Sequence, residues 1–283
     1  MNTWDSGIEP DYPAMTVLGG LRVVLRALLL AVVVFGGLLL LLLLRLIERP
    51  LFRLHRPMTP YITQMVCRAA LTIIGIQYQV EGMPMQRRGV VVSNHSSWLD
   101  IFALNAAKRV YFVSKSEVAG WMGIGWLARA TGTVFIERNP RRAQEQTLIF
   151  HQRLHEGHKL LFFPEGTSTD GLQVLPFKTT LFASFLKDDI RHEIAVQPVT
   201  LIYTAPAGTD PRFYGWWGDM SFGAHLLRTL APARHGSVRV VFHTPLPVAD
   251  YADRKALARA SEDAVRSAMP QDKVLESELE VAR

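Results

Sequence analysis

The chain has 283 residues, of which 49% are hydrophobic and 20% are charged, so it is long enough and apolar enough to bury a substantial core. This composition excludes an intrinsically disordered protein. Thirty-one Lys and Arg residues against 25 Asp and Glu residues give a net charge of +6, which suits an anionic membrane, an anionic substrate or nucleic acid without choosing among them. The single cysteine, Cys67, excludes an intrachain disulfide and is consistent with a reducing compartment.

An uncharged apolar stretch at residues 27–44 ends in seven consecutive leucines and is about the minimum length for a membrane-spanning helix. Basic residues are denser after this stretch than before it, so a spanning helix would leave the bulk of the chain in the cytoplasm and the acidic start outside. A helix that inserts without crossing is the alternative. No small-residue cleavage site follows the stretch, and we therefore favour a retained anchor over a signal peptide.

A second, amphipathic helix is predicted over residues 61–76, where apolar side chains recur at helical spacing. Pro50 and Pro57 are expected to separate it from the first helix. Residues 1–75 thus form a membrane-anchoring helical pair, joined by a basic connector that can lie against lipid headgroups.

Short apolar runs then alternate with helical patterns as far as residue 270. The predicted strands are 77–80, 90–93, 110–113, 133–137, 160–163, 194–202 and 238–243, and the predicted helices are 99–107, 121–130, 141–155, 179–186 and 251–269. This alternation is typical of an α/β domain, here 76–270, in which helices cover a largely parallel sheet and ligands bind at the carboxyl ends of the strands. Residues 271–283 form a polar tail.

His95 and Asp100 follow the apolar strand at 90–93 and are separated by four residues. A carboxylate bonded to one nitrogen of an imidazole fixes its tautomer and leaves the other nitrogen free to accept a proton, so this pair suits a general base. A structural alternative is that Ser96 or Ser97 caps a helix with Asp100 in its first turn.

Three further blocks also lie at strand ends. In order, the four blocks resemble the lysophospholipid acyltransferase family of the 1-acylglycerol-3-phosphate acyltransferase type, and the resemblance runs from about residue 76 to 205. The matching residues are Asn94, His95 and Asp100; Gly132, Phe135, Ile136 and Arg138; Phe163, Pro164, Glu165, Gly166 and Thr167; and Val196, Pro198 and Val199.

The resemblance implies a glycerolipid acyltransferase-type fold and a transfer without an acyl-enzyme. It assigns His95 as the base that takes the proton from an acceptor hydroxyl as this oxygen attacks an acyl thioester, and Asp100 as the residue that orients the ring. Backbone N–H groups around Gly166, or at the helix start after His95, would stabilise the oxyanion. No cofactor or metal is expected, because the donor is a substrate: acyl carrier protein or coenzyme A carrying the acyl group.

The substrate-binding residues that we expect are Asn94, Arg138, Glu165, Gly166, Thr167, Ser168 and Pro198. Arg138 would contact an anion, with a solvated basic loop as its alternative. Glu165 would bond an acceptor hydroxyl or order its loop. Pro198 would shape the acyl-chain side of the site.

One position departs from the family pattern. Members that act on lysophosphatidate usually have an arginine after Glu-Gly-Thr, where this chain has Ser168. The continuation through Asp170 to Lys178 resembles the branch that acylates lyso-ornithine lipids and related lyso-aminolipids. We therefore expect a lyso-aminolipid acceptor, with lysophosphatidate, or both acceptors, as the alternative. The resemblance also implies a bacterial inner membrane, with the catalytic domain on its cytoplasmic side and no role for nucleic acid.

Two alternative functions remain. The first is a lipid hydrolase that uses Ser168, because the segment Gly166-Thr167-Ser168-Thr169-Asp170 resembles a nucleophile elbow, although the final glycine is missing. The second is a non-enzymatic membrane adaptor, which would not need His95 and Asp100. The aromatic cluster 213–217 suits an interfacial belt or core packing equally. His151, His155 and His158 are interpreted as exposed polar residues rather than a metal site.

Overall fold

The structure, a computed structural model, describes residues 4–121, 123–137, 140–187 and 190–270. One eight-stranded sheet forms its centre, in the order β1-β7-β6-β2-β5-β3-β4, with β8 paired to β6. The strands are β1 (Gln77–Glu81), β2 (Gly89–Ser93), β3 (Tyr111–Lys115), β4 (Val134–Ile136), β5 (Leu160–Phe162), β6 (Ala195–Thr204), β7 (Ser237–Phe242) and β8 (Leu246–Pro247). The α/β fold expected from the sequence is confirmed.

The central part of the sheet is parallel. β2 pairs in parallel with both β5 and β6, whereas β7 and β8 run antiparallel to β6. The carboxyl ends of β2 and β5 therefore lie at the same sheet edge, so the segments that follow these two strands meet there. The sheet is more mixed than expected because β1 pairs with the reversed strand β7.

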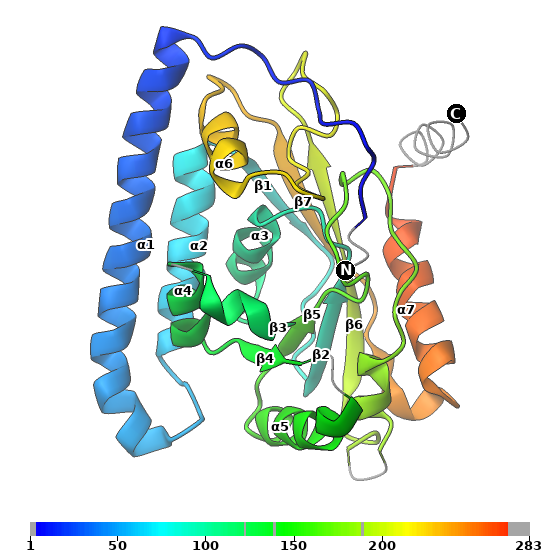
Figure 1. The fold of residues 1–283 in the computed structure, drawn as a ribbon. Coiled ribbons are helices and arrows are strands. Elements are labelled where there is room, and N and C mark those ends of the chain that lie inside the picture. Colours follow the sequence, from blue (N-terminus) through cyan, green and yellow to red (C-terminus); the bar gives the residue numbers. More distant parts are fainter. Residues whose placement is uncertain (1–3, 122, 138–139, 188–189, 271–283) are drawn as a thin grey trace.

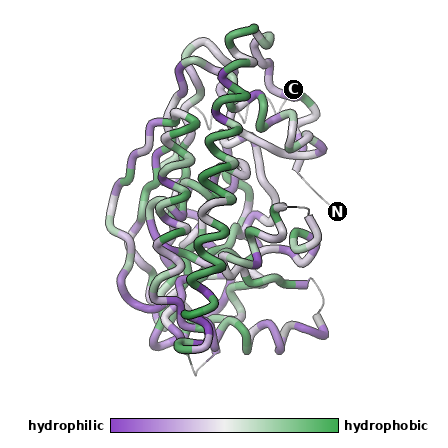
Figure 2. The backbone as a smooth tube through the Cα atoms, turned by 90° about the vertical axis from the view of Figure 1, so that its left-hand side faces the viewer, coloured by the Kyte–Doolittle hydropathy of each residue, from purple (hydrophilic) through white to green (hydrophobic). Residues whose placement is uncertain are grey.

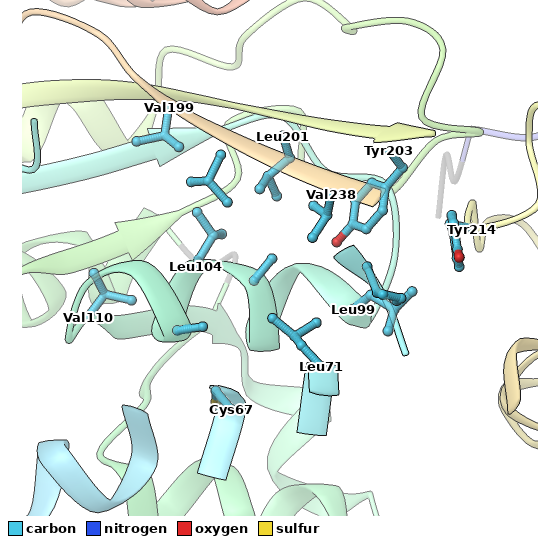
Figure 3. Packing of buried hydrophobic residues seen from close by; sticks show 14 of the residues in the cluster. Cys67, Leu71, Leu99, Leu104, Val110, Val199, Leu201, Tyr203, Tyr214 and Val238 are labelled. Carbon is cyan, nitrogen blue, oxygen red and sulfur yellow. The ribbon is translucent and has the colours of Figure 1, made fainter. Parts of the chain in front are cut away.

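Helices cover both faces of the sheet (Figure 1). One face carries α3 (Leu99–Ala107), with α1 (Val17–Phe52), α2 (Thr59–Ile74), α4 (Ile124–Thr131) and α6 (Phe222–Leu230) on the same side. Figure 3 shows the core on this side, where Leu71 of α2 and Leu104 of α3 face Leu201 and Val238 of the sheet. The other face packs against α5 (Ala143–His155) and α7 (Arg254–Ser267) through a second core cluster.

Several predicted elements differ from those observed. α6 and β8 were not predicted, and residues 179–186 form a short 3-10 helix, η3 (Leu181–Phe185), instead of an α-helix. The helix predicted from 121 begins at Ile124, after a 3-10 turn, η1 (Ser116–Gly120). Two more 3-10 turns, η2 (Pro140–Arg142) and η4 (Val248–Asp250), precede α5 and α7.

α1 is twice as long as the apolar stretch that predicted it, and Pro50 lies inside its last turn rather than between the helices. A proline at this position removes only one helical hydrogen bond. At the other end of α1, the Thr16 hydroxyl oxygen caps the helix by accepting from the Gly19 N–H at 3.0 Å. α1 is the one helix among the described residues that is long and apolar enough to cross a membrane, and only 6% of its most apolar window is buried. Figure 2 shows hydrophobic residues along its length, and we describe it as a membrane-associating helix.

Glu48 near the end of α1 holds the helical pair together. Its buried carboxylate accepts from the N–H groups of Met58 and Thr59 at 2.8 and 3.1 Å, and from the Thr59 hydroxyl at 2.6 Å. These two N–H groups lie at the start of α2, where backbone N–H groups have no acceptor within the helix itself. Arg45 pairs with the same carboxylate at 3.0 Å and balances its charge.

Candidate active site

The sequence block after β2 forms the centre of the site. Nδ1 of His95 lies 2.7 Å from Oδ2 of Asp100, which sits in the first turn of α3 and is fully buried. The same carboxylate oxygen accepts from the backbone N–H groups of Ser96 at 2.7 Å and Ser97 at 3.1 Å. Asp100 lies in the first turn of the helix, as the structural alternative expected, but the N-cap is Trp98 rather than Ser96 or Ser97, and the carboxylate also bonds the histidine.

Tyr203, at the end of β6, completes the surroundings of Asp100. Its hydroxyl donates to Oδ1 at 2.9 Å. Burial, followed by the negative charge of Asp100, raises the pKa of Tyr203 well above its ordinary value, so the phenol keeps its proton. Both carboxylate oxygens are then held by donors, which fixes the plane of the carboxylate.

The ring of His95 is fixed from a second direction. Phe163 stacks on it with ring centroids 3.9 Å apart and planes 7° from parallel. A carboxylate oxygen accepts hydrogen bonds, so in a neutral imidazole this contact would place the proton on Nδ1 and leave Nε2 as the acceptor. The His95 side chain is 22% exposed, so the site is open enough for a substrate to reach it.

Glu165, after β5, points into the fold. Oε1 accepts from the His95 N–H at 2.9 Å and Oε2 accepts from the Leu175 N–H at 3.2 Å. Burial raises the pKa of Glu165 well above its ordinary value, opposed by these two backbone N–H groups. Of the two roles considered for Glu165, this geometry supports the ordering of its loop.

Asn94 and Pro198 also shape the fold beside the site. The Asn94 amide forms two hydrogen bonds with the backbone of Leu201, at 2.9 and 2.8 Å, and so ties the end of β2 to β6. Pro198 lies between the parts of β6 that pair with β8 and with β7, and its carbonyl accepts from the His243 N–H. The missing N–H of the proline therefore removes no ladder bond from this side of the strand.

The turn after Glu165 lies against His95. Gly166 has a φ of +73°, a left-handed conformation that favours glycine, and the N–H of Thr169 donates to the His95 carbonyl at 2.9 Å. The Ser168 hydroxyl donates to the carbonyl of Trp216, whose N–H donates in turn to the carbonyl of Ser96. Thr167 and Ser168 thus lie beside the His95–Asp100 pair in a half-buried turn.

Other predicted residues are placed differently. Arg138 lies outside the described residues. His151 and His158 are buried, not exposed as expected: His151 bonds the Ser184 carbonyl at 2.8 Å, and His158 stacks on Tyr111. Within the described part of the chain, no group of three or more His, Cys, Asp or Glu residues is placed to hold a metal ion.

The sequence reasoning missed Tyr203 and the role of Phe163. Tyr203 carried no motif, and its only signal was its place at the carboxyl end of the strand next to β2. The aromatic cluster 213–217 serves mainly as core, because Phe213, Tyr214 and Trp217 are buried.

Known proteins resemble this chain over most of its length. A sequence profile of the Acyltransferase family matches residues 75–202. The chain is 59% identical over 262 residues to a lyso-ornithine lipid O-acyltransferase of Rhodobacter capsulatus, covering 93% of this chain and 95% of that protein. It is 32% identical over 208 residues to a 1-acyl-sn-glycerol-3-phosphate acyltransferase of Neisseria meningitidis, covering 72% and 79% of the two chains.

The fold is that of a solved acyltransferase. A 1-acyl-sn-glycerophosphate acyltransferase from Thermotoga maritima superposes with a TM-score of 0.60 at 22% identity, covering 89% of this chain and 94% of the other. With the profile match and the near full-length similarity to the Rhodobacter protein, this chain belongs to the Acyltransferase family and is an acyltransferase that transfers groups other than aminoacyl groups.

Proposed function

We propose that this protein transfers a fatty acyl group from an acyl thioester to the hydroxyl of a lyso-ornithine lipid, with His95 as the general base and Asp100 as the residue that orients it. The 2.7 Å contact between these two side chains carries the mechanistic part of the proposal. The 59% identity to a lyso-ornithine lipid O-acyltransferase supports the acceptor. The donor is a thioester of acyl carrier protein or coenzyme A.

The reaction balances without an acyl-enzyme. Nε2 of His95 takes the proton of the acceptor hydroxyl as that oxygen attacks the thioester carbon. The tetrahedral oxyanion then collapses, the new C–O bond remains, and the C–S bond breaks. The departing thiolate receives the proton from His95, so the imidazole returns to its starting state.

Oxyanion stabilisation is assigned to the turn after Glu165. The N–H groups of His95, Ser96 and Ser97 already donate within the protein, so these three amides before the helix are not free. In the turn, Gly166 N–H donates to the Phe163 carbonyl. The amides of Thr167 and Ser168, for which no acceptor is found among the described residues, are the donors that we propose.

We propose that the acceptor headgroup binds beside Ser168 and Asp170. The Ser168 hydroxyl and the buried Asp170 carboxylate provide no positive charge for a phosphate. Oδ1 of Asp170 accepts from the Leu172 N–H at 3.0 Å, which orders the local turn, and the Thr169 N–H holds this segment against the His95 carbonyl at 2.9 Å. A zwitterionic aminolipid headgroup suits these groups better than lysophosphatidate does. Lysophosphatidate is the second candidate, because relatives at about one-third identity bear that activity in their names.

We propose that residues 1–75 form the membrane-binding unit, with α1 in the plane of the bilayer and the domain 76–270 on the cytoplasmic side. At 36 residues α1 is about 54 Å long, well beyond the roughly 30 Å hydrocarbon thickness. The segment before α1 packs on the same domain as the segment after it: Trp4 contacts Trp217, and His55 lies 3.3 Å from the Glu156 carbonyl. This supports the non-crossing alternative, with the acidic start beside the domain rather than across the membrane.

The acceptor is tested with purified full-length protein and a labelled acyl thioester. Lyso-ornithine lipid and lysophosphatidate are offered separately in matched micelles, and the labelled products are separated. We expect kcat/KM to be at least about tenfold higher with lyso-ornithine lipid, which corresponds to about 1.4 kcal/mol of differential transition-state binding. Exclusive labelling of phosphatidate would reject this acceptor while leaving the acyl-transfer mechanism standing.

A further inference from the structure

A cavity of about 350 Å³ lies at the sheet edge opposite His95. Its lining includes Lys108 and Arg109, which precede β3, and Lys159, which precedes β5. Because β2, β3 and β5 form one parallel set, the residues that precede these strands lie at the edge away from the segment after β2. This cavity is therefore separate from the proposed acyl-transfer site.

The connector between α1 and α2 forms another wall of the cavity. His55, Arg56 and Pro57 of this connector line it, together with Tyr61 from the first turns of α2. The guanidinium carbon of Arg109 lies 3.9 Å from the centre of the Tyr61 ring, so the aromatic ring holds this cation in place. The cavity thus lies between the connector that follows α1 and the amino edge of the sheet.

Positive charge dominates the lining. Lys108 and Lys159 donate to the side-chain and backbone oxygens of Gln86 at 3.4 and 3.1 Å, which are neutral acceptors. Arg56 donates to the Ala130 carbonyl at 2.7 Å. In the described part of the chain, none of these three cations, nor Arg109, makes an ion pair with a carboxylate, and Glu156 is the one acidic lining residue.

These charges are crowded together. Burial, followed by the charges of Lys108 and Arg88, lowers the pKa of Lys159 to about 8. Burial, followed by the charges of Arg153 and Arg56, lowers the pKa of His158 to about 3, so that imidazole stays neutral. Cations that are held together without compensating carboxylates favour an anion from outside the chain.

We propose that this cavity binds the phosphate group of an anionic membrane phospholipid. Lys and Arg side chains are the ordinary ligands of phosphate, and a cavity of this size admits a phosphodiester headgroup. The connector argues for a lipid source, because it directly follows α1, which we propose lies in the plane of the bilayer, and so stays at headgroup level. The bound lipid would tie the helical pair to the amino edge of the sheet.

The test uses purified full-length protein in a nonionic detergent. The unfolding temperature is followed while phosphatidylglycerol, phosphatidylcholine or inorganic phosphate is added in separate titrations. We expect phosphatidylglycerol to stabilise the protein saturably, phosphatidylcholine to have little effect, and inorganic phosphate to need at least about a hundredfold higher concentration, because it lacks an acyl anchor. Equal stabilisation by phosphatidylcholine, or by inorganic phosphate at the same concentration, would overturn the proposal.

The double substitution Lys108→Gln/Arg109→Gln removes two cations from the cavity. We expect it to weaken the apparent affinity for phosphatidylglycerol by at least about tenfold. The matched control Arg254→Gln/Lys255→Gln removes the same charges at the start of α7, on the far face of the sheet, and should change the affinity by less than about twofold. An equal loss of affinity in both variants would mean that net charge alone causes the effect, and it would contradict binding at this cavity.

Two further measurements cover a variant that fails to fold and separate this cavity from the acyl-transfer site. If the double variant fails to fold, Lys108→Gln alone gives up one 3.4 Å hydrogen bond and is expected to weaken the affinity about threefold or more. Acyl transfer measured without phosphatidylglycerol should be unchanged in either variant, which separates this site from the proposed function. If the substitutions abolish binding of an acyl carrier protein and leave phosphatidylglycerol binding intact, the cavity is a protein-docking surface and the lipid proposal is wrong.

Discussion

The hydroxyl of Tyr203 donates to Oδ1 of Asp100 at 2.9 Å, while Oδ2 of the same carboxylate holds His95. This contact links the end of β6 to the first turn of α3 across the site. It makes Tyr203 a positioning residue for the catalytic pair that we propose.

Tyr203→Phe removes this donor and keeps the ring in the core. A hydrogen bond to a charged group contributes about 1.5–3 kcal/mol, so we expect kcat to fall about tenfold or more while KM changes less than about twofold. Tyr214→Phe is the matched control, because the Tyr214 hydroxyl contacts His235 and the Gly236 N–H instead. Steady-state kinetics of both variants measures the difference. An equal fall in kcat for the two variants would contradict the role of Tyr203 in positioning Asp100.

Ser168→Ala tests whether the serine is a nucleophile. Its hydroxyl donates to the Trp216 carbonyl and, among the described residues, bonds no histidine or lysine that could activate it, so we expect ester formation to continue within about tenfold of the unsubstituted rate. The labelled ester product is quantified after incubation with acyl thioester and acceptor. Loss of all turnover, together with acyl transfer to water by the unsubstituted protein, would favour the hydrolase alternative.

The stability of the protein should fall on mild acidification. Burial lowers the pKa of His225 to about 4, below the ordinary 6.5 that applies to the unfolded chain. Between these values the unfolded chain binds a proton that the folded chain does not, so the stabilising effect is complete above pH 6.5 and is lost as the pH falls toward 4. The slope for this residue is at most about 1.4 kcal/mol per pH unit.

His225→Asn isolates this effect. The Asn oxygen replaces Nδ1 as the acceptor for Trp98 Nε1, which donates to it at 2.9 Å, and the side chain no longer titrates. Denaturant unfolding between pH 7.5 and 4.5 should show a shallower loss of stability for the variant. Identical slopes for the two proteins would mean that His225 is not held neutral in the fold.

Two adjacent glycines provide a matched test of the helical pair. A Cβ atom at Gly37 would lie 2.3 Å from Cγ2 of Val66 on α2, whereas one at Gly36 would meet nothing within 4 Å. Gly37→Leu should therefore destabilise the protein in detergent by about 1–3 kcal/mol, through overpacking between α1 and α2. Gly36→Leu should be neutral or slightly stabilising, because leucine is the better helix former. The reverse order of unfolding temperatures would contradict the packing of α1 on α2.

The sequence predicted the parts of the site that depend on one strand and its following segment. His95 and Glu165 each follow an apolar run that could be recognised as a strand of a largely parallel sheet, so their place at the same sheet edge could be anticipated. Tyr203 could not be found this way, because its contact with Asp100 depends on β6 lying beside β2, and strand order is a long-range property.

The same limit explains the roles of Asn94 and Glu165. Their residue types suggested substrate contact, yet both side chains bond backbone groups that are far away in sequence or across a loop. The length of α1 was underestimated because its ends carry arginines. Two of them bond the domain: Arg22 donates to the Ala231 carbonyl, and Arg26 donates to the carbonyls of Leu230 and Pro232.

The central claim is that His95 is the base for acyl transfer, and the most direct measurement is single-turnover transfer of a labelled acyl group to lyso-ornithine lipid by His95→Ala. We expect the rate to fall by about 10²–10⁴, the range for loss of a general base, with an unfolding temperature close to that of the unsubstituted protein. A folded His95→Ala protein that forms the ester within tenfold of the unsubstituted rate would contradict the mechanism.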